Sequence, residues 1–208
     1  MGSWMDRRAT LLRHNIGSWD SQFVRFDNKG REQERFPCHL EVLEMGDAIF
    51  STLTYVNTGR TGQMRFHEPP EEMQISPEGH WSLGPSFNGY GAWVSEFCLC
   101  GGDRRCRAVI RHDSHGLASL VLIMEWRSGT PPVTIPAEIQ LDPHSLDSPG
   151  CIGMQGWSWQ KGVTLIAMAE RHQGQAQVCG LHWTQPDGVD REIMRRHSSD
   201  GYLLPLSV

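Results

Sequence analysis

Short runs of alternating apolar and polar residues cover most of the chain. The clearest run is residues 119–127, where every second position from Leu120 to Trp126 is apolar. An alternation with a period of two places these side chains on one face of a β-strand. The intervening positions begin apolar and end with Glu125 and Arg127. We therefore predict a strand here with one face buried in a core.

The same pattern predicts a series of strands separated by turns. They lie at residues 18–26, 36–45, 48–56, 62–67, 72–75, 80–84, 92–100, 104–111, 118–127, 133–141, 153–159, 163–171, 176–183, 188–195 and 202–206. Turn sequences such as Asn28-Lys29-Gly30 and Asn57-Thr58-Gly59 recur at intervals of about ten residues, which is typical of antiparallel sandwiches and barrels. No long helical pattern alternates with the strands, which argues against a parallel sheet. We therefore predict an all-β, antiparallel fold.

One short helix is predicted ahead of the first strand. Residues 3–15 would place Trp4, Leu11 and Leu12 on an apolar side of this helix. The length of 208 residues suits one domain, because single sandwiches and barrels often reach this size. We therefore predict a single domain over residues 1–208.

The charge and hydropathy of the whole chain exclude some classes of function. The formal net charge is -5, whereas proteins that bind nucleic acid generally carry a basic surface. No apolar run is long enough to span a membrane, and residues 1–4 lack the apolar segment of a secretory signal. We expect a cytoplasmic protein with no nucleic-acid partner and no membrane span.

Six cysteines raise a choice between free thiols and a metal site. Cys98 and Cys100 face the same side of a predicted strand, and Cys106 would oppose them across a hairpin. His112 could complete a set of four ligands, but structural zinc sites generally use closer Cys-x2-Cys pairs. Without a secretory signal, disulfides are not expected either. We favour buried thiols and predict no metal site.

Two neighbouring predicted strands carry a face that mixes charged with apolar residues. Arg107 and Arg111 share this face on residues 104–111, and Glu125 and Arg127 share it on the strand described above. In a sandwich such a face would be solvated, and in a barrel it would line a wet or anion-binding interior. The sequence leaves both open, and we favour the solvated surface.

The opening of the chain resembles that of a known group of barrels. Gly17-x-Trp19 follows a helical lead within the string LLRHNIGSWDSQFVRFDNKGREQERFPCHLEV. Over about residues 10–45 this string is similar to the start of a lipocalin-like (calycin) family of unknown function from cyanobacteria and plastids. The resemblance implies a lipocalin-like β-barrel in which Trp19 packs across the closed base. Gly17 would then permit a close approach of the chain.

The resemblance extends in length, opening and architecture to the S-type phycobiliprotein lyases. Those proteins hold an open-chain tetrapyrrole, a bilin, and deliver it to a cysteine of an antenna protein. By this fold-level analogy we expect a bilin-binding lyase or carrier that forms a thioether between the bilin and a client cysteine. The bilin would be a bound substrate, and no resident cofactor is predicted. A phycobiliprotein subunit is an expected partner, and the sequence also allows a homodimer.

The chemistry of a bilin selects the candidate site residues. Its propionates suit arginine, its pyrrole nitrogens suit one buried carboxylate, and its conjugated body suits aromatic neighbours. Glu125 is the candidate catalytic residue, because its carboxylate would hold or protonate the pyrrole system. The candidate ligand-binding residues are Arg107, Arg111, Arg127, Trp93, Trp126 and Trp157. The alternative for each of them singly is an exposed ion pair or a tryptophan of the core.

Two other functions stay open at this point. A non-catalytic carrier of a fatty acid, carotenoid or chlorophyll derivative would have a purely apolar interior, whereas charged interior residues favour the bilin. An assembly protein would have a barrel filled by its own side chains, which eight tryptophans could supply.

Overall fold

The computed structural model describes residues 6–89, 91–147, 151–159, 162–185 and 187–206. Within these residues the strands form two antiparallel sheets. The first contains β1 (Gly17–Asp27), β2 (Glu32–Met45), β3 (Ala48–Tyr55), β4 (Thr61–Phe66), β5 (Gln74–Ile75), β6 (Trp81–Leu83), β7 (Trp93–Gly101), β8 (Arg104–His112) and β9 (Leu117–Arg127). The second contains β10 (Asp142–Ser145), β11 (Met154–Trp159), β12 (Val163–Met168), β13 (Gln177–Thr184) and β14 (Asp190–His197).

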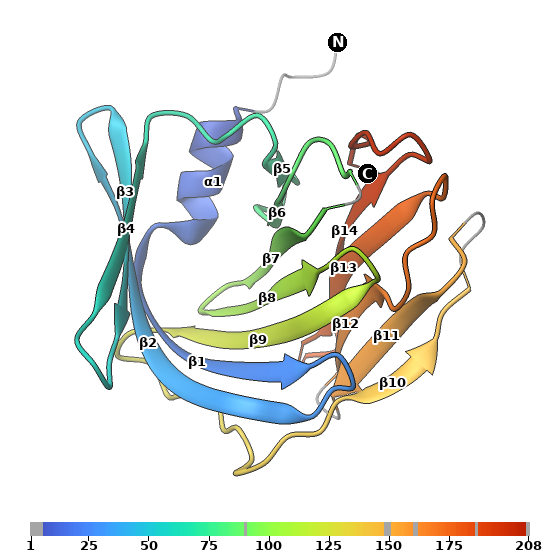
Figure 1. Cartoon of the computed structure of the whole chain (residues 1–208). Helices are drawn as coiled ribbons and strands as arrows, with labels where there is room; N and C mark the ends of the chain where they lie inside the picture. The colour runs from blue at the N-terminus through green and yellow to red at the C-terminus, as the bar shows by residue number, and fades with distance from the viewer. Residues whose placement is uncertain (1–5, 90, 148–150, 160–161, 186, 207–208) are drawn as a thin grey trace.

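The first sheet curls into a half-barrel. Its strand order is β4-β3-β2-β1-β9-β8-β7-β6-β5, so the long strands β1, β2 and β9 form its middle. Figure 1 shows the sheet bending around α1 (Arg7–Asn15), which lies in the hollow. The prediction of an all-β, antiparallel, lipocalin-like fold with a short N-terminal helix is confirmed.

The main hydrophobic core lies between the two sheets. Leu120 and Leu122 of β9 pack there with Trp157 of β11 and Leu165 of β12, and all four are at most 1% exposed. Leu120 and Leu122 belong to the alternating run, so their burial against the second sheet accounts for that half of the pattern. Val121 and Ile123, on the other face of β9, pack with Phe23 of β1 and Cys38 of β2. The prediction of a single domain over residues 1–208 stays a prediction.

Helix α1 is shorter than the sequence suggested. Asp6 caps it, with its carboxylate accepting a hydrogen bond from the Ala9 backbone at 2.9 Å, so the helix begins at Arg7. Trp4 falls outside the described residues. No helix in the described part of the chain is long and apolar enough to cross a membrane.

Two predicted strands are absent from the described residues. Residues 133–141 make one isolated bridge at Gln140, and regular pairing begins only at β10. Pro136 removes a backbone donor from this stretch, and Pro131 and Pro132 directly precede it, which disfavours a ladder here. Residues 202–206 likewise make only isolated bridges and do not close the sheet.

Candidate functional site

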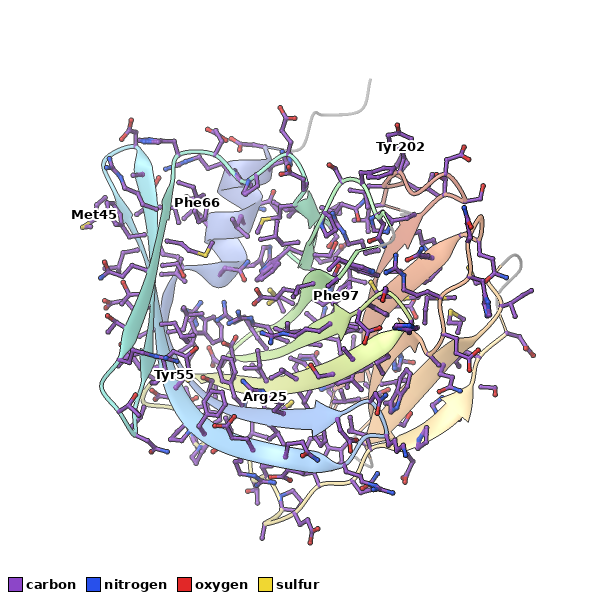
Figure 2. The ribbon with its side chains drawn as sticks, viewed as in Figure 1. Arg25, Met45, Tyr55, Phe66, Phe97 and Tyr202 are labelled. Carbon is purple, nitrogen blue, oxygen red and sulfur yellow. The ribbon has the colours of Figure 1, made fainter. Side chains whose placement is uncertain are left out.

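A cavity of about 130 Å³ lies between α1 and the hollow face of the curled sheet. We call it the α1 cavity. Its apolar walls include Leu11 and Leu12 of α1, Leu40 and Val42 of β2, Ile49 of β3 and Leu83 of β6. Figure 2 shows Phe66, another lining residue, at the end of β4 nearest α1. The strands alternate, so one face of each contributes to this wall while the other face packs elsewhere.

The floor of the α1 cavity is ionic. Glu125 of β9 is fully buried, and its Oε2 accepts a hydrogen bond from Nε of Arg105 at 2.7 Å. Its Oε1 accepts from Nη1 of Arg107, also at 2.7 Å, and the other end of that guanidinium pairs with Glu96 of β7. We call these four residues the ionic floor. Two positive and two negative groups make it neutral overall, which is the condition for burying charge at moderate cost.

Opposing effects act on the charge of Arg107. Burial disfavours the charged guanidinium, but the carboxylates of Glu125 and Glu96 outweigh burial and raise its pKa above the ordinary value. Its Nε is buried without a hydrogen-bond partner among the described residues. Arg107 therefore carries a permanent charge and one unused donor directly under an apolar cavity.

The Gly17-x-Trp19 motif lies beside the ionic floor and contacts its arginine Arg105. Trp19 is fully buried, and the guanidinium carbons of Arg105 and Arg127 lie 3.8 and 3.9 Å from the centre of its ring. Gly17 has a φ of +113°, and a β-carbon there would collide with Nη1 of Arg127. The glycine thus leaves room for the Arg127 side chain, whereas the approach expected from the resemblance was that of the chain itself.

Asn15, the last residue of α1, connects the helix to the ionic floor. Its side-chain oxygen accepts hydrogen bonds from Nε1 of Trp81 at 3.0 Å and from Nη1 of Arg105 at 3.2 Å. Its side-chain nitrogen donates to the Leu11 carbonyl at 3.0 Å. Sequence reasoning missed this residue. The only indication in the sequence was an asparagine, a residue type often found at helix ends, at the last position of the predicted helix.

The paired thiols of β7 lie beside this junction. Cys98 and Cys100 face the same side, as expected, with their sulfurs 4.0 Å apart. The hydrogen bond from Cys98, together with His80 and the charge of Arg105, lowers the pKa of Cys100 to about 5 despite its burial. Cys106 was expected to oppose them, and this was wrong, because it points into the core between the sheets. In the described ranges, His, Cys, Asp and Glu form no group of three suited to a metal ion.

Comparison with known proteins identifies the family. The pattern of the family described as "Domain of unknown function (DUF3598), N-terminal" matches residues 6–130, which is more than half of the chain. The chain belongs to the DUF3598 family. The resemblance of the opening string to a lipocalin-like family of unknown function is thereby confirmed.

Solved structures agree with this DUF3598 fold. A DUF3598 protein of unknown function from Nostoc punctiforme PCC 73102 is 17% identical, with a TM-score of 0.81 over 98% of this chain and 97% of that one. An S-type phycobiliprotein lyase from Guillardia theta is 12% identical, with a TM-score of 0.42 over 58% of this chain and 92% of the lyase. The first likeness shows the fold, and the second is too low to carry an argument. No curated protein matches.

The DUF3598 fold brings only part of the predicted site together. Glu125 and Arg107 meet in the ionic floor, joined by Arg105, which the prediction had not included. Arg127 lies beside them but is engaged with Trp19 and the Ile16 carbonyl. The expectation of a solvated face was therefore wrong at Glu125 and Arg107, whose side chains are 0% and 11% exposed.

The remaining predicted ligand-binding residues lie away from the α1 cavity. Arg111 is exposed on β8, in agreement with the solvated alternative. Trp93 and Trp157 are buried in the core between the sheets, and Trp126 lies on the face of β9 opposite Glu125. The curled sheet separates these tryptophans from the arginines, so the six residues do not form one site.

Proposed function

We propose that this DUF3598 protein binds a small, mainly apolar molecule in the α1 cavity. The observation that supports this is the combination of apolar walls with a buried, internally neutralised ionic floor. Small-molecule sites are concave and mostly apolar, with a few polar groups that fix the orientation of the ligand. The protein would act as a carrier or sensor, because binding of this kind requires no bond to be made or broken.

The size of the α1 cavity limits what enters it. A volume of about 130 Å³ is close to that of engineered cavities that hold one benzene ring. Drug-sized ligands generally occupy about 300–1,000 Å³. A slender apolar end, such as an acyl chain or a single ring, therefore fits with little rearrangement, whereas a broad ligand would need α1 or the β3–β4 hairpin to move.

The ionic floor favours a slender apolar ligand that carries one hydrogen-bond acceptor at the end that reaches the floor. Glu96 is the most accessible member of the floor, with its side chain 28% exposed, and it holds the outer end of Arg107. A ligand oxygen that displaced Glu96 would pair with Arg107 and leave the buried pairs to Glu125 intact. An amphipathic monocarboxylate meets both requirements.

A bilin is the second candidate, and the charged floor is the observation that favours it. Arg107 would pair with a propionate, and the apolar walls would contact the pyrrole rings. Glu125 as a catalytic residue remains a proposal, and both of its oxygens are already held by Arg105 and Arg107. Thioether transfer to a phycobiliprotein subunit would follow only if a bilin binds first.

The test fills the α1 cavity and measures binding. Val42→Trp would place a large side chain in it, while Leu43→Trp adds the same side chain on the opposite face of β2, where Leu43 is 38% exposed. We expect a fluorescent C18 acid to bind the parent protein and to lose about tenfold or more in affinity with Val42→Trp, but not with Leu43→Trp. Phycocyanobilin absorption is followed in parallel to compare the two ligand classes.

Equal affinity of the two tryptophan variants, or no binding of either ligand by the parent protein, would contradict the proposal. A red-shifted bilin band that only Val42→Trp abolishes would favour the second candidate. Thermal unfolding of both variants shows whether the packing survived the substitution.

A further inference from the structure

A second hollow lies on the same curved sheet, away from α1. It has a volume of about 500 Å³ and is lined by Arg25, Glu34, Phe36, Tyr55 and Arg60, together with the turn that contains Asn57. We call it the aromatic hollow. Figure 2 shows Arg25 and Tyr55 at the end of the sheet opposite to Phe66. No residue lines both this hollow and the α1 cavity, so the two are separate.

A series of aromatic rings forms one wall of the aromatic hollow. Phe23 of β1 and Phe36 of β2 are direct cross-strand partners, and their rings stack with centroids 5.2 Å apart. The ring centroid of Phe36 lies 5.6 Å from that of Tyr55 of β3. The rings lie on one face of three neighbouring strands, and Phe36 and Tyr55 are half-buried at the hollow. Such a wall offers π-faces and edges to a planar ligand.

The charge in the aromatic hollow is positive. The guanidinium of Arg60 lies over the Tyr55 ring, 4.5 Å from its centre, and pairs with no carboxylate of the described residues. Arg25 pairs with Glu34 at 2.9 Å, but both side chains are about half exposed, so water and incoming anions compete with that pair. Arg35 also lines the hollow, but Glu32 neutralises it at 2.7 Å. The site therefore presents one unneutralised arginine and one that a ligand can recruit, in a chain of net charge -5.

We propose that the aromatic hollow binds a planar aromatic anion, that is, a ring that carries a carboxylate, sulfonate or phosphate group. The ring would pack on Phe36 and Tyr55, and the anionic group would pair with Arg60 and Arg25. Neither half of the ligand suffices alone, since an exposed arginine holds simple anions weakly and the wall is too open to retain a neutral ring.

The experiment is a titration with 2-naphthoate followed by NMR of backbone amides and arginine Nε–H groups. Arg60→Ala and Arg60→Gln remove the charge. Arg65→Ala is the matched control, because Arg65 is also exposed and lies over an aromatic ring, that of Phe50, yet does not line the hollow. We expect signals of Tyr55, Arg25 and Arg60 to shift, with the affinity reduced about fivefold or more by either Arg60 variant and less than twofold by Arg65→Ala.

Two further ligands test the contributions of the ring and of the negative charge separately. 2-Naphthalenemethanol keeps the ring without the anion, and inorganic phosphate keeps an anion without the ring, and both should bind at least about fivefold more weakly than naphthoate. Equal binding of either one, equal loss in the Arg60 and Arg65 variants, or shifts confined to the α1 cavity around Leu11 and Ile49 would overturn the proposal.

Discussion

At the scale of single residues, Glu125 is a buried charge that depends on its two arginine partners. Its carboxylate is fully buried and is neutralised by Arg105 on one oxygen and Arg107 on the other. Burial of an unpaired charge is expensive, so each member of such a group depends on the others. Loss of the carboxylate would leave two buried guanidinium groups against Glu96 alone.

We therefore expect Glu125→Gln to lower the free energy of unfolding by about 3 kcal/mol. Urea denaturation at neutral pH measures the change. Glu34→Gln serves as the control, because its pair with Arg25 is exposed and its loss should cost less than about 1 kcal/mol. Similar losses in the two variants would show that the ionic floor contributes no special stability.

His112 makes stability depend on pH. It is 2% exposed and stacks on Trp93 with ring centroids 4.3 Å apart. Burial, helped by the charge of Arg171, lowers the pKa of His112 to about 3. The unfolded chain binds this proton near pH 6.5, so stability is complete above that pH and falls as the pH drops from 6.5 toward 3.

The expected slope from this one group is at most about 1.4 kcal/mol for each pH unit inside that window. Unfolding midpoints measured between pH 7.5 and pH 4.5 should fall less steeply for His112→Phe than for the parent protein. His115→Phe is the control, because the His115 side chain is 92% exposed. An unchanged slope in His112→Phe would exclude His112 as a source of the acid sensitivity.

At the scale of elements, α1 is held at both ends. Arg7 donates to the carbonyl groups of Pro70 and Met73 at 2.7 and 2.5 Å, and Asn15 joins the other end to β6 and β8. The helix lines the α1 cavity, so these contacts fix one wall of the cavity in place. The Asn15 contacts are the buried ones, and their loss would leave several polar groups unsatisfied.

We expect Asn15→Leu to destabilise the protein by about 3 kcal/mol, because Trp81 and Arg105 would lose a buried acceptor. Hydrogen exchange should also quicken first in the amides of α1 and β6. Gln63→Leu on the exposed strand β4 is the control, and it should change the stability by less than about 0.5 kcal/mol. If hydrogen exchange quickened equally across both sheets, α1 would not open independently of the rest of the protein.

The sequence predicted where the strands lie better than it predicted which strand faces are buried. The period of two located β7, β8 and β9 closely, and the turn residues located most of the hairpins. It could not show that α1 and the curled sheet bury the second face of β8 and β9, because the arginines and glutamate there look like solvent-facing positions. Only the register that sets Arg105 opposite Glu125 turns this face into an ionic floor.

At the scale of the whole molecule, the central strands of the curled sheet are buried on both faces. One face packs on the second sheet, and the other holds the α1 cavity, Trp19 and the ionic floor. A fold of this kind separates a packed core from a face that carries a cavity. It also explains why tryptophans and arginines that look like one site in the sequence lie on opposite sides of the curled sheet.

If the α1 cavity receives an apolar molecule, a bound C18 acid lies inside it, and the position of that acid can be measured directly. NMR contacts between the acid and methyl groups of the protein locate it without relying on activity. We predict contacts from the apolar chain to Leu11, Leu40 and Ile49. Contacts only to Phe36 and Tyr55 of the aromatic hollow, or no contacts to cavity methyl groups at saturating acid, would contradict the account.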